Sequence, residues 1–433
     1  MPPRNRGTAG RLKRATSRQL DANPMRDAQR PDLSTTFTVL LAGGRGSRLH
    51  ELTSRECKPA LPFAGPRRIV DFTLANAARS GLTRMIVATQ YRPETLSHHL
   101  ESRWASRFAE GSLRLREGTA VTGTPQGYGG TAAAVAANLA ELQSEGVREL
   151  VVLAADHVYE MDYADMVAAH RASGASATVA VDTVPSDRAS EFGVVRTSEG
   201  GLIESFLEKP AVVPADPAVP GRAQVSMGIY VFDLDWLASV LRIIPGTTQD
   251  FGHDILPLAV ALGEAHAYRV PGDNFYWRDV GTLDAYRLAQ LEFQTGEAPC
   301  ALPPRIAASE HEMKAATGEL IQFAFRMQTG GIALHSPRLG GDLPGRWTML
   351  DESVLLPGAR VAPGVRLTRT IVAPGTSVPA GLVIGEDPDE DARWFRRTEE
   401  GTVLVTTPML ARRAADRGRL VAPFADSRMG RSA

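Results

Sequence analysis

A glycine-rich segment with two arginines follows a fully apolar run near the start of this 433-residue chain. The run Val39-Leu40-Leu41-Ala42 leads into Gly43-Gly44-Arg45-Gly46-Ser47-Arg48. Glycines let phosphates approach the backbone closely, and the freed N–H groups form an anion-binding nest. Arg45 and Arg48 add charged, fork-shaped donors. The segment predicts a site for a diphosphate or triphosphate, and the simpler alternative is a glycine turn after a strand that binds nothing.

Spacing excludes two better-known phosphate loops. No Gly-Lys-Ser/Thr closes the segment, as a Walker A loop requires, and the G-x-G-x-x-G order of a dinucleotide site is missing. Lys58-Pro59 follows nine residues after Leu49. Lys58 is one of only four lysines, the others being Lys13, Lys209 and Lys314. Because an ammonium and a guanidinium are not equivalent, Lys58 and Lys209 are predicted to lie where a compact charge is needed.

Further along, polar side chains follow other apolar runs. Asp156 ends the run that begins at Val151, and this placement is typical of a magnesium site, because Mg²⁺ prefers carboxylate and phosphate oxygens together. A turn cap is an equal alternative. His157 has no Cys/His cluster beside it and is predicted to be structural. The amide of Gln90 has the groups to pair with an adenine edge, and a plain loop glutamine is the alternative.

The elements that must position these residues alternate between strand-like and helix-like segments. The apolar, β-rich runs are Thr38–Leu41, Arg84–Thr89, Glu149–Ala154, Ala177–Val181 and Ser226–Phe232. The helical segments are Ile69–Ser80, Thr131–Gln143, Tyr163–Ser173 and Leu283–Phe293. Such alternation predicts βα units and a mainly parallel sheet covered on both faces. Ligands bind at the carboxyl ends of strands in such sheets, and the polar residues above follow those ends.

A six-residue rhythm begins near Val354. Pro357-Gly358 recurs as Pro363-Gly364, and Val372, Val378 and Ile384 keep the same step. This pattern predicts a hexapeptide-repeat parallel β-helix. An irregular Pro/Gly-rich β region is the alternative. The repeat is short, which predicts few coils.

Taken together, Gly43-Gly44-x-Gly46-x-Arg48-Leu49 followed by Lys58-Pro59 resembles the signature of nucleotide-sugar pyrophosphorylases. The details resemble the bacterial ADP-glucose pyrophosphorylases (glucose-1-phosphate adenylyltransferases) over about residues 38–410. The resemblance implies an α/β fold, with a Rossmann-like nucleotidyltransferase domain and a short left-handed parallel β-helix domain. The expected divisions are a poorly ordered basic arm over 1–34, the catalytic domain over 35–300, a connection over 301–340, and the β-helix domain with the C-terminal segment over 341–433.

The resemblance also implies a function: transfer of AMP from ATP to α-D-glucose 1-phosphate, giving ADP-glucose and pyrophosphate for glycogen synthesis. It implies Mg²⁺ as cofactor, an allosteric metabolite effector, a homotetramer and a cytoplasmic location. The catalytic residues that it implies are Arg48, Lys58 and Asp156. The nucleotide-binding residues are Leu41, Ala42, Gly43, Gly44, Arg45, Gly46, Gln90 and Gly130. Glucose 1-phosphate is assigned to Tyr128, Gly193, Glu208, Lys209 and Ser226, the metal to Asp156 and Asp279, and the effector to Arg55 and Arg68.

By residue type alone, Glu208-Lys209-Pro210 is more simply a surface ion pair before a proline turn; the sugar-phosphate role rests on the resemblance. The chain also departs from the family pattern. Glu56 replaces a position that is often basic, Gly129 replaces an arginine, and Ala133 replaces an aspartate. Three alternatives therefore stay open: a pyrophosphorylase for UTP, dTTP or GTP, a regulatory subunit of an active paralogue, and an acyltransferase of the β-helix class.

Composition sets the remaining bounds. The formal net charge of −1 gives no electrostatic reason to expect binding to nucleic acid or to an anionic membrane. The sequence contains no run of eighteen apolar residues, so no transmembrane helix is expected. Two cysteines, Cys57 and Cys300, cannot form a disulfide framework and fit a reducing compartment. The arginine-rich arm is expected to be solvated, with an anion-binding arm or a transit peptide as alternatives.

Overall fold

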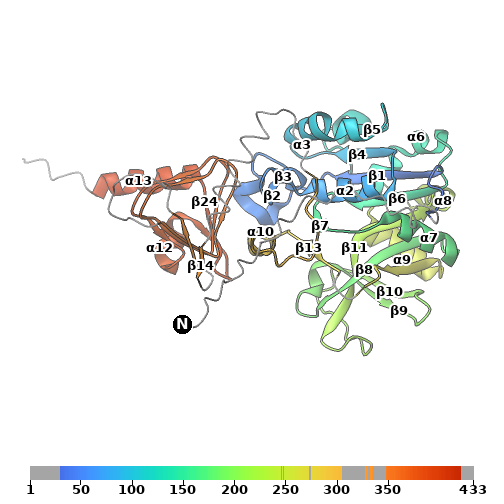
Figure 1. Ribbon diagram of the computed structural model, residues 1–433. Helices are drawn as coiled ribbons and strands as arrows, with labels where there is room; N and C mark the ends of the chain where they lie inside the picture. Colours follow the sequence, from blue (N-terminus) through green and yellow to red (C-terminus); the bar gives the residue numbers. More distant parts are fainter. Residues whose placement is uncertain are drawn as a thin grey trace, which may run out of the picture.

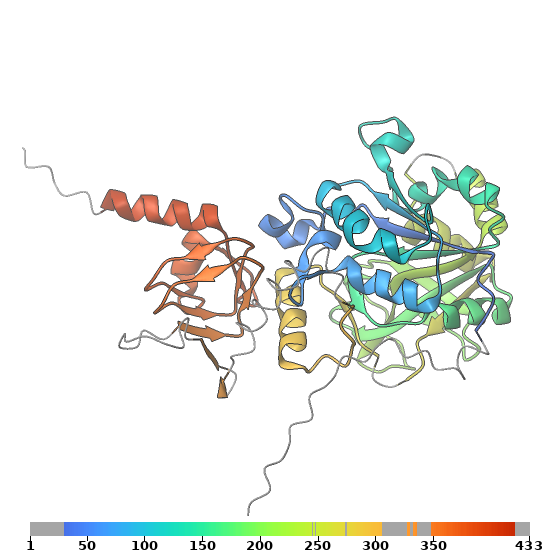
Figure 2. The same ribbon diagram turned by 45° about the horizontal axis from the view of Figure 1, so that its top comes forward.

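The computed structural model describes residues 30–244, 246, 248–272, 275–304, 327–329, 332–335 and 348–420. The basic arm predicted for residues 1–34 therefore lies, except for its last five residues, outside the described part, and so does most of the connection predicted for residues 301–340. A large α/β body and a smaller β domain lie side by side, with helix α10 (Leu283–Thr295) between them (Figures 1 and 2).

The α/β body is built on a nine-stranded sheet with the order β10-β9-β11-β6-β1-β4-β5, in which β8 pairs with β11 and β12. One half is parallel and consists of β1 (Thr36–Ala42), β4 (Met85–Thr89), β5 (Leu113–Glu117) and β6 (Glu149–Ala154). The other half is mixed and consists of β8 (Ala177–Pro185), β9 (Gly193–Thr197), β10 (Ile203–Glu208), β11 (Arg222–Asp233) and β12 (Ala265–Arg269). The predicted Rossmann-like α/β class is confirmed, and β11 is the strand that introduces antiparallel pairing.

Strand register explains why residues far apart in sequence meet. Leu41 of β1 pairs with Ala88 of β4 on one side and with Ala154 of β6 on the other. Because these three strands are parallel, their carboxyl ends reach the same edge of the sheet. The glycine-rich segment, Gln90 and Asp156 each follow one of these ends.

Helices cover both faces of the sheet. Neighbouring side chains of β1 point to opposite faces, so they pack against different helices. Leu40 packs in a buried cluster with residues of α2 and α7, whereas Val39 packs with residues of α5, α8 and α9. The helices of the body are α2 (Val70–Ser80), α3 (Glu94–His99), α4 (Gly118–Thr122), α5 (Thr131–Ala136), α6 (Leu139–Ser144), α7 (Tyr163–Ser173), α8 (Leu234–Ile243) and α9 (Leu256–Ala261).

One helix prediction is wrong. The segment predicted as a single helix over 131–143 is two short helices, α5 and α6, with a break near Asn138. The Asn138 side chain donates a hydrogen bond to the Ala134 carbonyl at 2.7 Å. Asparagine competes in this way with the backbone pattern of a helix, and the apolar periodicity of the segment hid that competition.

The smaller domain has the coiled strand pairing of a parallel β-helix. Met349 pairs with Arg366, Val354 with Ile371 and Arg360 with Ser377, all in parallel. Its strands are β14 (Met327–Thr329), β15 (Ile332–His335), β16 (Thr348–Asp351), β17 (Val354–Leu355), β18 (Arg360–Val361), β19 (Arg366–Thr368), β20 (Thr370–Val372), β21 (Ser377–Val378), β22 (Val383–Ile384), β23 (Arg396–Arg397) and β24 (Val403–Val405). Helices α12 (Pro388–Trp394) and α13 (Thr407–Leu420) complete it. The hexapeptide prediction is confirmed for the parallel, β-helix-like strands.

Candidate active site

The glycine-rich segment leaves the carboxyl end of β1 and enters a short 3₁₀ helix, η1 (Ser47–Thr53). Gly46 precedes η1 with a φ of 61°, and a Cβ at this position would lie only 2.9 Å from the Cβ of Lys58. Both the left-handed backbone and the close contact require glycine. Gly44 is exposed, and a Cβ there would meet nothing within 4 Å, so space beside the segment is open.

The other predicted nucleotide residues of this segment lie around the same edge. Leu41 and Ala42 end β1, and the Leu41 carbonyl accepts a hydrogen bond from the Ala155 N–H at 3.1 Å. Arg45 is exposed, with its guanidinium 5.1 Å from the ring centre of Tyr91, a cation–π contact. Gly43 backs onto Gln90: a Cβ on Gly43 would lie 3.2 Å from the Cβ of that glutamine.

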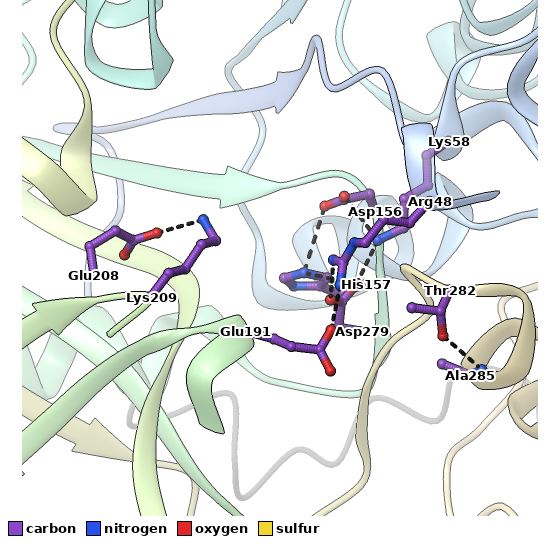
Figure 3. Close-up of polar contacts among 10 residues, drawn as sticks. All are labelled: Arg48, Lys58, Asp156, His157, Glu191, Glu208, Lys209, Asp279, Thr282 and Ala285. Carbon is purple, nitrogen blue, oxygen red and sulfur yellow. Dashed lines mark hydrogen bonds and ion pairs between the residues drawn. The ribbon is translucent and has the colours of Figure 1, made fainter. Parts of the chain in front are cut away.

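Lys58, on the short helix η2 (Lys58–Ala60), forms the centre of a charged cluster (Figure 3). Its Nζ lies 2.6 Å from Asp279 Oδ1 and 3.1 Å from Asp156 Oδ2. Only 5% of the Lys58 side chain and 11% of the Asp279 side chain are exposed. A lone ammonium this deeply buried would be strongly unfavourable, and the two carboxylates compensate its charge.

Arg48 approaches the same cluster from η1. One of its guanidinium nitrogens lies 3.6 Å from Asp279 Oδ2, and another donates to the carboxylate of Glu191. Glu191 ends the short helix η5 (Ala189–Glu191), which precedes β9. Arg48 is half-exposed, so it is the cation of this cluster that solvent and an incoming ligand reach most easily.

Strand pairing outside the main sheet brings the two aspartates together. Strand β13 (Trp277–Asp279) runs antiparallel to β7 (His157–Tyr159), with Asp279 opposite His157. This register places Asp279 beside Asp156, the residue that precedes β7. The His157 Nε2 lies 3.7 Å from Asp156 Oδ1 and 3.9 Å from Asp279 Oδ1, and its ring packs edge-on against Trp277. The imidazole thus borders the pair of carboxylates.

Electrostatics keep the cluster charged. Burial by itself raises the pKa of the Asp279 carboxyl, but the charge of Lys58 and its hydrogen bond, with a smaller effect of Arg48, outweigh burial and hold this pKa at about 2. The pKa of Asp156 is lowered for the same reasons, chiefly by Lys58 against the effect of burial. Burial lowers the pKa of Lys58, and the two carboxylates raise it above its ordinary value. The site therefore holds two carboxylates and one ammonium at neutral pH.

Gln90 holds a neighbouring loop in this structure. Its Oε1 accepts from the Tyr128 N–H at 2.8 Å, and its Nε2 donates to the Gln126 carbonyl at 2.9 Å. Both polar atoms of the Gln90 side-chain amide thus form hydrogen bonds with backbone groups of this loop. Gly130 is also packed against the protein, since a Cβ on it would lie 2.3 Å from the Gln249 carbonyl oxygen.

Tyr128, a predicted sugar-phosphate residue, is held by packing and by hydrogen bonds within the protein. Its ring is buried against Ala88 and Ala134, and its hydroxyl donates to the Arg116 carbonyl at 3.1 Å. Its apolar ring is used in packing and its hydroxyl is satisfied by a backbone oxygen. Tyr128 lies beside Gln90, and its assignment to glucose 1-phosphate stays a prediction.

The sugar-phosphate candidates gather at the ends of the antiparallel strands. Glu208 ends β10, and its Oε1 lies 2.6 Å from the Nζ of Lys209. The Glu208 carboxylate is bordered by Gly193 and Gly252, because a Cβ on either glycine would lie 3.0 Å or less from Oε2. Lys209 is 62% exposed and has a φ of 43°, a backbone conformation that costs a non-glycine residue about 1–3 kcal/mol. Such strain is found preferentially at functional sites.

Ser226 lies on β11 where the pairing with β8 is irregular, between Ser226 and Tyr230. Its hydroxyl accepts from the Gly228 N–H at 3.2 Å and lies 3.4 Å from the Tyr230 hydroxyl. Bulges of this kind redirect side chains next to active sites. The side chain is nearly buried, so a small polar ligand group is the partner that it suits.

The two predicted effector residues differ in exposure. Arg55 is exposed. Arg68 on β3 (Arg67–Arg68) is paired with Glu56 at 3.3 Å and also donates to the Ala60 carbonyl. The Glu56 carboxylate thus neutralises part of the positive charge of Arg68 that an anionic effector would need.

The chain is similar to known proteins over most of its length. Residues 37–296 match the model of the nucleotidyl transferase family, and residues 345–405 match that of the GlmU-like C-terminal hexapeptide family. The chain is 40% identical to the glucose-1-phosphate adenylyltransferase of Jannaschia sp. (strain CCS1) over 412 residues, which cover 88% of this chain and 97% of that protein. It is 39% identical to that of Rhodopseudomonas palustris (strain HaA2) over 406 residues, 87% of this chain and 96% of the relative.

The chain belongs to the glucose-1-phosphate adenylyltransferase family. This confirms the resemblance stated from the sequence. In this member of the glucose-1-phosphate adenylyltransferase family, sequence reasoning missed Glu191, which pairs with Arg48, and the close approach of Gly252 to Glu208. Of the string Glu191-Phe192-Gly193, the sequence prediction includes only Gly193. A carboxylate two residues before that glycine was the available signal.

Proposed function

We propose that this chain transfers the adenylyl group of ATP to α-D-glucose 1-phosphate, giving ADP-glucose and pyrophosphate. The observation that carries the proposal is the cluster at the ends of the parallel strands. Arg48 and Lys58, two cations suited to phosphates, share Asp279 there, and Asp156 stands beside it. The family relationship supports the choice of substrates, and the open space at Gly44 supports entry of a phosphate chain.

The chain's own residues position and neutralise charge. The N–H groups of Gly43 to Gly46 and the Arg48 guanidinium hold the β and γ phosphates. Lys58 faces the α-phosphate region, and Lys209 holds the phosphate of the sugar, with Glu208 accepting from sugar hydroxyls. A phosphate oxygen of glucose 1-phosphate attacks the α-phosphorus in line. The new O–P bond forms as the bond to the β-phosphate oxygen breaks, and pyrophosphate leaves with that electron pair.

The carboxylates fit a divalent cation such as Mg²⁺. Asp156 and Asp279 both approach the Lys58 ammonium in the structure, and this arrangement of their oxygens around a positive charge supports the proposal. No group of three or more His, Cys, Asp or Glu side chains suited to a metal is found in the part of the chain that the structure describes. Two carboxylates together with substrate phosphates are a usual Mg²⁺ environment. When bound, such an ion neutralises and orients the phosphates.

Other features of the family stay predictions for this chain: a homotetramer, an allosteric metabolite effector and a cytoplasmic location. Arg55 is the exposed candidate for effector binding. The Glu56–Arg68 pair favours a weak response to anionic effectors, because a carboxylate there repels a phosphorylated ligand. No described helix is long and apolar enough to cross a membrane.

Pyrophosphate release tests the proposal. The purified chain is mixed with glucose 1-phosphate and Mg²⁺, and ATP is compared with UTP, dTTP and GTP. We expect a strong preference for ATP, and turnover reduced by about 10²–10³-fold in the Asp156→Asn variant. That variant is expected to remain folded, because Lys58 keeps Asp279 as a partner. Preference for another nucleotide would overturn ATP as the proposed substrate. Full activity of Asp156→Asn would overturn the proposed role of this carboxylate.

A further inference from the structure

An ion pair joins the smaller domain to η1, the short helix that follows the glycine-rich segment. Arg396 on β23 donates through Nε to Glu51 Oε2 and through a terminal nitrogen to Glu51 Oε1, both at 2.6 Å. Glu51 lies on η1, the same short helix that carries Arg48. Bidentate pairing of this kind fixes orientation as well as distance. The hydrogen bonds from Arg396 are also the main cause of the lowered pKa of the Glu51 carboxyl.

The backbone between Arg48 and Glu51 needs such support. His50, which separates them, has a φ of 51° and a ψ of −121°, outside helical values and in the left-handed half of the map. A non-glycine residue adopts this conformation only where surrounding contacts impose it. Contacts on each side of His50 therefore decide the direction in which the Arg48 side chain points away from η1.

Those contacts come from the α/β body and from the smaller domain. Leu49 and Leu52, the apolar residues of η1, are buried in one cluster with Val354, Ile371 and Leu404. All three of these partners belong to the β-helix-like domain. The apolar cluster that buries Leu49 and Leu52 thus includes residues more than 300 positions away in sequence, and Arg396 pairs with Glu51 on the polar face of η1.

The domain that carries Arg396 is itself anchored independently of η1. Arg287 on α10 is buried and donates to the Thr402 hydroxyl at 2.9 Å and to the Glu352 carbonyl at 3.0 Å. Asp284, also on α10, accepts from the Thr398 hydroxyl at 2.8 Å. These contacts fix the smaller domain on α10, so the position of Arg396 relative to Glu51 does not depend on their ion pair alone.

We propose that Arg396 is a positioning residue for the nucleotide: through Glu51 it fixes η1 and so aims Arg48 at the phosphates. The inference rests on the proposed role of Arg48 in binding the nucleotide. It assigns to the smaller domain a direct part in forming the nucleotide side of the site. The sugar side, on β10 and β11, has no comparable contact with that domain among the described residues.

The test compares Michaelis constants for the two substrates in Arg396→Gln. We expect the KM for ATP to rise about tenfold, since small misplacements of a binding group have effects of this size, and the KM for glucose 1-phosphate to stay within about twofold. Glu51→Gln removes the same pair from the catalytic side and is expected to give the same pattern. Arg396→Lys is expected to restore only part of the affinity, because an ammonium cannot form the bidentate pair.

Arg366→Gln is the matched control. Arg366 is half-exposed and pairs with Glu386 through two nitrogens, but both residues lie within the smaller domain. We expect this variant to keep both Michaelis constants, and all variants to keep the circular dichroism of the wild type. Unchanged KM for ATP in Arg396→Gln and Glu51→Gln, or an equal rise in both constants, would overturn the positioning role. Failure of the wild type to use ATP would instead overturn the proposed function.

Discussion

The nucleotide side and the sugar side of the site are built in opposite ways. On the nucleotide side, parallel buried strands end in a cluster whose charges neutralise one another, and Lys58 is 5% exposed. On the sugar side, antiparallel strands with an irregular register end in one ion pair, and Lys209 is 62% exposed. The chain thus places one of its four lysines in each half, in nearly opposite environments.

This difference in burial predicts that residues of the nucleotide side contribute to both folding stability and ligand binding, whereas Lys209 contributes to binding alone. Removing a charge from a buried cluster leaves its partners unpaired, so nucleotide-side residues contribute to both stability and chemistry. An exposed ion pair contributes little to stability, so Lys209 is free to serve the ligand alone. Substitutions in the two halves should therefore differ in kind as well as in size.

The largest expected effect follows Lys58→Met. This change removes the cation nearest to both Asp279 and Asp156 and leaves Arg48 3.6 Å from Asp279. The loss of one partner of a buried pair costs about 3–5 kcal/mol of unfolding free energy. Turnover is expected to fall by about 10³-fold, since a phosphate-neutralising group is lost. Urea unfolding and pyrophosphate release measure the two effects. A variant that loses activity at unchanged stability would show that the cluster does not support the fold.

A smaller effect is expected from acid. The pKa of Asp279 is about 2 in the folded chain and about 3.9 in an unfolded one. The carboxylate therefore contributes about 2–3 kcal/mol to stability above about pH 4, and this contribution is lost as the pH falls toward 2. Urea unfolding at pH 6 and at pH 3 should show a smaller acid loss for Asp279→Asn than for the wild type. The exposed Asp187→Asn is the control, and equal acid losses in all three proteins would contradict the account.

The smallest effect on stability is expected for Lys209→Gln. Because this side chain is mostly exposed, the unfolding free energy should change by less than about 0.5 kcal/mol. The KM for glucose 1-phosphate is nevertheless expected to rise by about tenfold or more, since a charged donor to phosphate is removed. Thermal unfolding and initial rates with varied sugar phosphate measure both. A destabilised variant would show that the two halves are not separated in this way.

The sequence predicted elements and motifs better than it predicted contacts between them. The run that ends at Ala42 and the helix Tyr163–Ser173 follow directly from apolar pattern and turn residues, and the structure has both. The hexapeptide rhythm predicted the parallel pairing of the smaller domain. These features depend on local sequence, where propensity and periodicity carry the information.

Contacts between distant segments were beyond that reasoning. Asp279 reaches Asp156 only because β13 pairs with β7, and both strands are three residues long. The pairing of Glu51 with Arg396 joins residues 345 positions apart. Nothing in periodicity or spacing encodes such a partner. Tyr128 shows the same limit, since its burial beside Ala88 depends on how its loop folds back on β4.

The central claim is that Arg48 serves the nucleotide and Lys209 the sugar phosphate. The most direct test is to measure the KM for ATP and for glucose 1-phosphate in Arg48→Gln and Lys209→Gln side by side. We predict a crossed result, in which Arg48→Gln raises only the KM for ATP and Lys209→Gln raises only that for glucose 1-phosphate. Equal rises in both constants for either variant, or the reverse assignment, would contradict the division of the site into these two halves.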